Sequence, residues 1–174
     1  MRGIFLSISS DCPQRDERWG WTGDIQVFGP TASFLFDTDG FLVSWLRDLA
    51  LEQEHNGGVV PVIVPSPLTV LRGPVAAWGD AASILPWVLD ERFADAAAVA
   101  AQYPSMRAWA ETVIAESDPQ TLLWDASFQF GDWLDPDAPA DLPGRAKTQP
   151  DVVATAHVFR TLTLTARAAE RLGE

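Results

Sequence analysis

Apolar residues recur at three- and four-residue spacing along much of this chain, and the connections between these stretches alternate between short and long. Side chains at that spacing share one face of an α-helix, so the pattern is typical of amphipathic helices. It predicts a short helical piece from Thr31 and longer helices at about 39–54, 80–93, 96–114 and 151–172. The alternating connections favour an all-α fold, in which paired helices form a ring or a bundle with elaborated loops.

The segments between the predicted helices carry residues that favour turns and extended chain. Val59–Val75 is rich in valine and proline and is predicted to be an extended loop. The aromatic stretch 121–134 alternates, which is typical either of a short strand pair or of a loop that lines a site. Residues 135–150 are predicted to form a surface loop. The segment before Thr31 is predicted to be irregular because of residues that punctuate regular structure, namely Gly20, Gly23, Gly29 and Pro30.

Composition narrows the class of partner. The net charge of −12 disfavours nucleic acid and anionic membranes, whereas a neutral small molecule such as a carbohydrate is compatible with it. Cys12 is the single cysteine, so neither an internal disulfide nor a cysteine-based zinc site is expected. No apolar run reaches membrane-spanning or secretory length, and we therefore expect a cytoplasmic protein. With 174 residues and 47% hydrophobic content, residues 1–174 are expected to form a single domain.

The segment 11–24 combines carboxylates, arginines and tryptophans in a way that neither a buried core nor a plain loop requires. A sugar site uses both kinds of side chain: carboxylates move protons and hold hydroxyls, and flat aromatic faces cover the apolar side of a pyranose. Glu17 lies beside Asp16, with Arg15 and Arg18 close by. A neighbouring carboxylate raises the pKa of an acid and a guanidinium lowers it, which is how acid and base roles separate. A salt-bridged surface turn is the alternative interpretation.

Three segments resemble the signature motifs of the inverting α-L-rhamnosidases of glycoside hydrolase family 78, in the order expected for that family. The first runs from Phe5 to Pro30. The others are Ala76-Ala77-Trp78-Gly79-Asp80-Ala81 and Phe128-Gln129-Phe130-Gly131-Asp132-Trp133-Leu134. The resemblance implies part of an (α/α)6 barrel, a ring of helical hairpins with the sugar site in the loops at one end. We expect little β structure, near the N-terminus and around 121–134.

The resemblance also implies roles for particular residues. Glu17 matches the general acid that protonates the leaving oxygen when a terminal α-L-rhamnose is released. No cofactor or metal is expected. The positions that match sugar-binding residues are Asp11, Arg15, Trp21, Asp24, Trp78 and Trp133. Asp80, which follows Trp78 closely, is expected to be a helix N-cap or a loop brace.

The chain departs from the family pattern in one respect. The family's general base lies well downstream, and no residue here matches it; Glu170 and Glu174 are expected to be solvated. We therefore expect residues 1–174 to be the first part of a catalytic barrel. Two alternatives stay open: a non-catalytic half-domain that binds sugar weakly or self-associates through an exposed barrel face, and a different sugar-processing enzyme on the same barrel.

Overall fold

The computed structural model describes residues 18–66, 73–133, 135–142 and 144–174. Apart from one isolated antiparallel bridge, between Trp21 and Ile63, these residues form helices, turns and loops. The helices are α1 (Thr22–Leu35), α2 (Asp39–His55), α3 (Ala81–Phe93), α4 (Ala96–Glu116) and α5 (Pro150–Leu172). The all-α prediction is confirmed.

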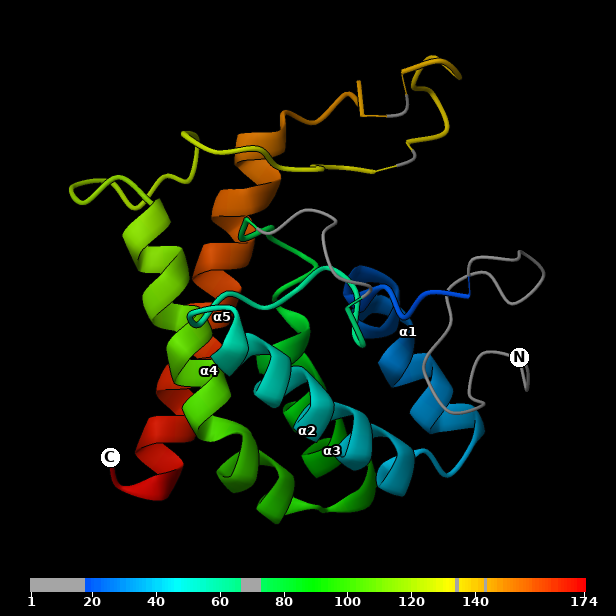
Figure 1. The fold of residues 1–174 in the computed structure, drawn as a ribbon, viewed down its shortest axis with the longest axis vertical. Coiled ribbons are helices and arrows are strands. Elements are labelled where there is room, and N and C mark those ends of the chain that lie inside the picture. The colour runs from blue at the N-terminus through cyan, green and yellow to red at the C-terminus, as the bar shows by residue number, and fades with distance from the viewer. Residues whose placement is uncertain (1–17, 67–72, 134, 143) are drawn as a thin grey trace.

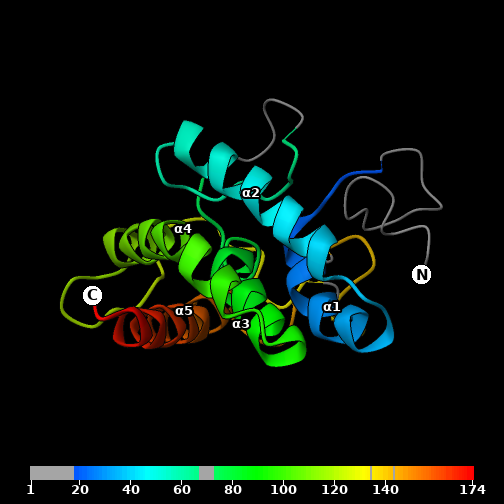
Figure 2. The same cartoon turned by 90° about the horizontal axis from the view of Figure 1, so that it is seen from below.

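Alternate helices occupy alternate layers. Helix α3 packs against both α1 and α5, and these three stand in one row (Figure 2). Helices α2 and α4 contact each other in a second row that covers the first. Antiparallel hairpins that share their helices between an inner and an outer layer are the repeating unit of an (α/α)6 ring, so the ring interpretation of the sequence holds.

The long connections gather at one end of the helices. Figure 1 shows the short α1–α2 and α3–α4 turns at the lower end. On the opposite, upper side lie residues 18–21, which lead into α1, and the described parts of the α2–α3 and α4–α5 connections. Segments that are far apart in the sequence, around 20, 75 and 130, therefore meet there. The stretch 121–133 is irregular, so the loop, and not the strand pair, is the correct alternative.

The core is centred on α3. Every residue from Ala81 to Leu89 is buried, because α3 has neighbours in its own row and in the row above. Trp45, Trp87 and Trp109 are buried as their helical spacing predicted, and Trp124 is fully enclosed as well. None of the helices described is long and apolar enough to cross a membrane.

Helix α1 corrects one prediction. It begins at Thr22, not near Thr31, and it contains Gly23, Gly29 and Pro30, which are residues that predict irregular structure. The glycines serve close packing. A Cβ atom on Gly23 would lie 2.7 Å from the ring of Trp78, and one on Gly29 would lie 2.5 Å from Leu85 Cδ2. Sequence periodicity misses α1 because contacts with other segments select its glycines.

Gly79 provides a test of the same packing. Its missing side chain leaves room for the buried Trp109 ring, and a Cβ atom there would overlap that ring. We expect Gly79→Ala to lower the free energy of unfolding by about 2–3 kcal/mol, measured by urea denaturation, because an enclosed indole cannot move aside. Gly40→Ala is the matched control. Gly40 lies in α2 with open space around its Cα, so this change should be neutral or stabilising. Equal losses for the two variants would contradict the packing explanation.

Candidate functional site

Aromatic side chains from three distant segments meet at the loop end of the helices. The Trp78 and Phe130 rings have centroids 4.4 Å apart, and Phe130 lies 5.0 Å from Trp133 and 5.2 Å from Phe128. Trp78 also belongs to a small buried cluster against which further aromatic rings pack. We call the whole group the loop-end aromatic cluster; it comprises Trp19, Trp21, Trp78, Phe128, Phe130 and Trp133.

The N-terminal part of this cluster is fixed to the α2–α3 connection by backbone hydrogen bonds. The N–H of Thr22 donates to the carbonyl of Val62, and the N–H of Val64 donates to the carbonyl of Gly20, each at 2.9 Å. The Thr22 hydroxyl donates to the carbonyls of Pro61 and Val62, at 3.2 and 3.1 Å. The chain is therefore held firmly at the point where it enters α1.

The second part is a turn just before α3. The backbone of Ala77 adopts φ +68, a left-handed conformation that L-residues other than glycine seldom adopt. The N–H of Ala77 donates to Asp80 Oδ2 at 2.6 Å, and the N–H of Ala76 donates to Gln129 Oε1 at 2.8 Å. The Trp78 ring that follows is enclosed by Gly23 of α1 and by Phe130.

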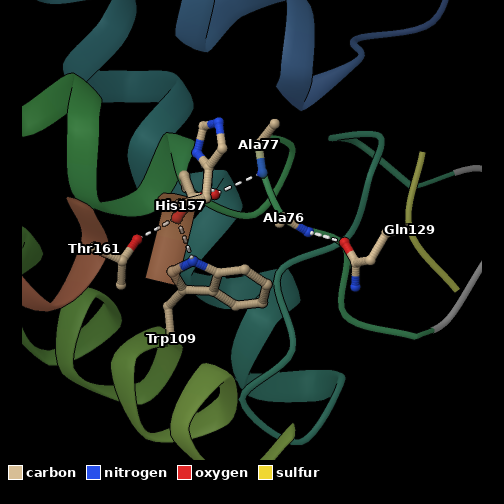
Figure 3. Close-up of polar contacts among 7 residues, drawn as sticks. Ala76, Ala77, Trp109, Gln129, His157 and Thr161 are labelled. Atoms are coloured by element: carbon tan, nitrogen blue, oxygen red, sulfur yellow. Dashed lines mark hydrogen bonds and ion pairs between the residues drawn. The ribbon is translucent and has the colours of Figure 1, made fainter. Parts of the chain in front are cut away.

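Asp80 anchors this turn to the rest of the protein. Its carboxylate is 1% exposed, and Oδ1 accepts hydrogen bonds from Trp109 Nε1 at 3.2 Å and from the hydroxyl of Thr161. His157 Nδ1 lies 3.0 Å from Oδ2 (Figure 3). A buried carboxylate needs such partners to offset its lost hydration. The prediction of a loop brace is confirmed, and the brace ties the turn to both α4 and α5.

The α4–α5 connection is closed by its own polar groups beside Trp133. The Asp135 carboxylate accepts hydrogen bonds from the N–H groups of Lys147, at 3.0 Å, and Asp137, at 2.9 Å. These donors hold the pKa of Asp135 below its usual range. Lys147 Nζ also pairs with the Asp137 carboxylate. No group of three potential metal-ligating side chains occurs in the part of the chain that the structure describes.

Comparison with known proteins identifies the family. The model for the bacterial alpha-L-rhamnosidase 6 hairpin glycosidase domain matches residues 1–174. The chain belongs to this rhamnosidase family. It is 38% identical over 175 residues to an α-L-rhamnosidase from Formosa agariphila, covering 100% of this chain and 18% of that protein.

Solved structures of rhamnosidases share the fold. Native α-L-rhamnosidase from Aspergillus terreus superposes with a TM-score of 0.92 at 41% identity, over 99% of this chain and 20% of that one. The α-L-rhamnosidase from Streptomyces avermitilis complexed with L-rhamnose gives 0.84 at 39% identity, over 99% of this chain and 16% of that one. The chain therefore spans about a fifth or less of the length of these relatives.

The structure brings together part of the site predicted from the rhamnosidase motifs. Trp21, Trp78 and Trp133 all belong to the loop-end aromatic cluster. Trp78 is buried, whereas Trp133 is 42% exposed and presents its ring to solvent. Asp24 lies exposed in the first turn of α1, at the same end. The remaining predicted positions lie outside the described residues and stay predictions: Asp11, Arg15 and Glu17.

The sequence reasoning did not single out Phe130 and Gln129 as part of the site. Phe130 lies at the centre of the aromatic cluster, and Gln129 holds the turn before Trp78. The alternating aromatic residues in 121–134 are the sequence feature that points to them. This pattern is compatible with a loop that lines a site, but it does not identify the segment against which the loop packs.

The Asp80 brace gives a stability prediction. We expect Asp80→Ala to lower the free energy of unfolding by about 3 kcal/mol or more, because it leaves the buried donors of Trp109 and Thr161 without an acceptor. Asp90→Ala is the matched control. Asp90 also lies on α3 and also pairs with α5, through Arg171 at 2.6 Å, but the Arg171 side chain is 41% exposed, so solvent screens this pair in part and it should contribute less. Similar losses in urea denaturation would refute the special role of Asp80.

The Asp135 contacts give a pH prediction. Since the folded protein lowers the pKa of this carboxyl, its contribution to loop closure is present at neutral pH and is lost as pH falls through the lowered value. The amide resonance of Lys147 should therefore titrate with a midpoint below 3.8, the ordinary value for aspartate. Asp135→Asn should abolish the titration. A midpoint at or above 3.8 would show that the hydrogen bonds do not hold in solution.

Proposed function

We propose that this chain supplies the acid-bearing, sugar-binding part of a glycoside hydrolase that releases terminal α-L-rhamnose from rhamnosides. Membership of the rhamnosidase family supports the proposal, as do the names of relatives aligned along nearly the whole chain. The reaction requires a proton donor, a water molecule and a base, and the proposal involves no cofactor or metal.

The loop-end aromatic cluster is the observation that carries the proposal. It is a surface with exposed rings at Trp133 and Phe128, which pack through Phe130 against the buried Trp78. L-Rhamnose is a deoxysugar, and its methyl group and ring hydrogens form apolar patches that suit indole faces. Its hydroxyls suit charged partners such as Asp11, Arg15 and Asp24, because hydrogen bonds to ionised groups are the stronger kind.

In the proposed mechanism, Glu17 protonates the glycosidic oxygen as the bond to the anomeric carbon breaks. Water attacks that carbon from the opposite face and inverts its configuration, and a carboxylate supplied from outside this chain accepts the proton of the water. Glu17 lies just upstream of Gly20, whose carbonyl accepts the Val64 N–H. This anchor supports the assignment because a general acid must be held within reach of its substrate oxygen.

Hydrolysis of an aryl α-L-rhamnoside tests the assignment of Glu17. We expect Glu17→Gln to reduce turnover by about 10²–10⁴-fold, because an amide cannot donate the proton, while L-rhamnose binding stays within a few-fold. Initial rates and equilibrium binding measure the two effects separately. Glu111→Gln, on the exposed face of α4, is the control and should behave as wild type. Near-normal turnover by Glu17→Gln would overturn the assignment.

The same assay distinguishes a second candidate, a non-catalytic half-domain. A folded wild-type chain that binds L-rhamnose without turning over the aryl rhamnoside would favour this candidate. Helices α1 and α5, which stand at the two ends of the row that also contains α3, carry exposed apolar side chains that support self-association (Figure 2). These are Val27 and Phe34 on α1, and Val152 and Phe159 on α5. Light scattering should then give a multiple of 19.0 kDa, and a clean monomer would exclude this form of association.

A further inference from the structure

Gln129 makes a pair of contacts that are unusual for a loop residue. Its side chain is 8% exposed although it belongs to an irregular segment. Its Oε1 accepts a hydrogen bond from the N–H of Ala76 at 2.8 Å, and its Nε2 donates to the carbonyl of Pro74 at 3.4 Å (Figure 3 labels Gln129 and Ala76). One amide thus holds the backbone of 74–76 at two points, 53 residues away along the chain.

A second side chain fixes the next peptide. The N–H of Ala77 is bound by Asp80, so two successive N–H groups are held by two side chains from different segments. The left-handed backbone of Ala77 follows directly after these two N–H groups and costs energy that its surroundings must offset. This conformation sets the direction in which the chain leaves the turn, and hence where the ring of Trp78 stands.

The residue after Gln129 completes the arrangement. The ring of Phe130 lies 4.4 Å from the ring of Trp78, with an angle of 42° between their planes. Residues 129 and 130 therefore hold the segment before α3 in two ways. The Gln129 side chain binds the backbone of this segment, and the Phe130 ring packs against the ring of Trp78. Phe130 in turn packs edge-on against Trp133, so it connects the buried Trp78 with the exposed ring of Trp133.

We propose that Gln129 is a positioning residue for the sugar site: its amide fixes the turn at 74–77 and thereby places Trp78 against Phe130 and Trp133. Gln129 itself does not contact the sugar. The consequence for sugar affinity rests on the proposed function, whereas the consequence for Trp78 does not. A purely structural role would lower stability without moving one indole selectively.

The test combines a spectroscopic signal with a binding measurement on the full 174-residue chain. Tryptophan is labelled with ¹⁵N, and the indole resonance of Trp78 is assigned by its absence in Trp78→Phe. Gln129→Met has similar length but cannot bind the Ala76 N–H. We expect it to shift the Trp78 resonance and to weaken L-rhamnose binding by about 10-fold, because the net contribution of one hydrogen bond corresponds to a change of about this size.

Two further variants make the test specific. Gln129→Glu keeps an acceptor oxygen for the Ala76 N–H but loses the donor to the carbonyl of Pro74, so it should recover only part of the wild-type shift and affinity. Ser127→Ala is the matched control in the same loop. It removes the acceptor of the Trp124 indole, 2.6 Å away, and should leave the Trp78 resonance and the affinity unchanged. If Gln129→Met does not fold, Gln129→Asn withdraws the same polar atoms by one methylene and should act in the same direction.

The outcomes separate the two proposals. A Trp78 resonance that is unchanged in Gln129→Met, or shifted equally by Ser127→Ala, overturns the positioning role, whatever the sugar does. If wild type does not bind L-rhamnose but the Trp78 resonance shifts selectively, the proposed function fails while the positioning role holds. If wild type binds and Gln129→Met binds equally well, the role of Gln129 in sugar affinity is refuted and the proposed function stands.

Discussion

The buried carboxylate of Asp80 is the interaction on which the loop end depends. It stands at the entry to α3 and receives donors from the preceding turn, from Trp109 of α4 and from Thr161 of α5. Hydrogen bonds from these groups replace the water that the carboxylate loses on burial. Removing the carboxylate therefore leaves several buried donors without an acceptor. Because the contacts reach three elements, the turn that carries Trp78 cannot shift without disturbing the helical scaffold.

Tryptophan rings at the loop end are held in place as well, because they pack closely against the backbone of glycine residues. Gly79 leaves room for the Trp109 ring, and Gly23 leaves room for the Trp78 ring, so each indole lies against bare backbone. A flat ring that packs against backbone has little freedom to reorient, since both its faces are occupied. Trp78 is thus a rigid wall of the loop-end aromatic cluster, and Trp133 and Phe128 are its accessible parts.

Local periodicity was sufficient to predict the longer helices, because α2, α4 and α5 each bury one side and α3 is a continuous apolar stretch that is buried from Ala81 to Leu89. It failed at α1, where Gly23 and Gly29 are chosen by contacts with Trp78 and Leu85. The tryptophans of the site were found through motif resemblance. Their proximity could not be derived from the sequence, because it depends on how the long connections fold back at the same end. Gln129 was missed for the same reason, since its partners lie 53 and 55 residues away.

The contacts of Asp80 also limit the chemistry that this carboxylate can perform. A general acid must reach the glycosidic oxygen and give up a proton to it, which requires an open approach. Asp80 is 1% exposed and its oxygens are already engaged by donors, so its chemistry is confined to holding the turn. The proposed function therefore needs a different carboxylate as its proton donor. It gives this role to Glu17, which precedes by three residues in the sequence the stretch 20–22 that is hydrogen-bonded to Val62 and Val64. The backbone hydrogen bonds fix Gly20 and Thr22 to the scaffold, so a proton donor just before them in the sequence would be attached to an immobile part of the chain.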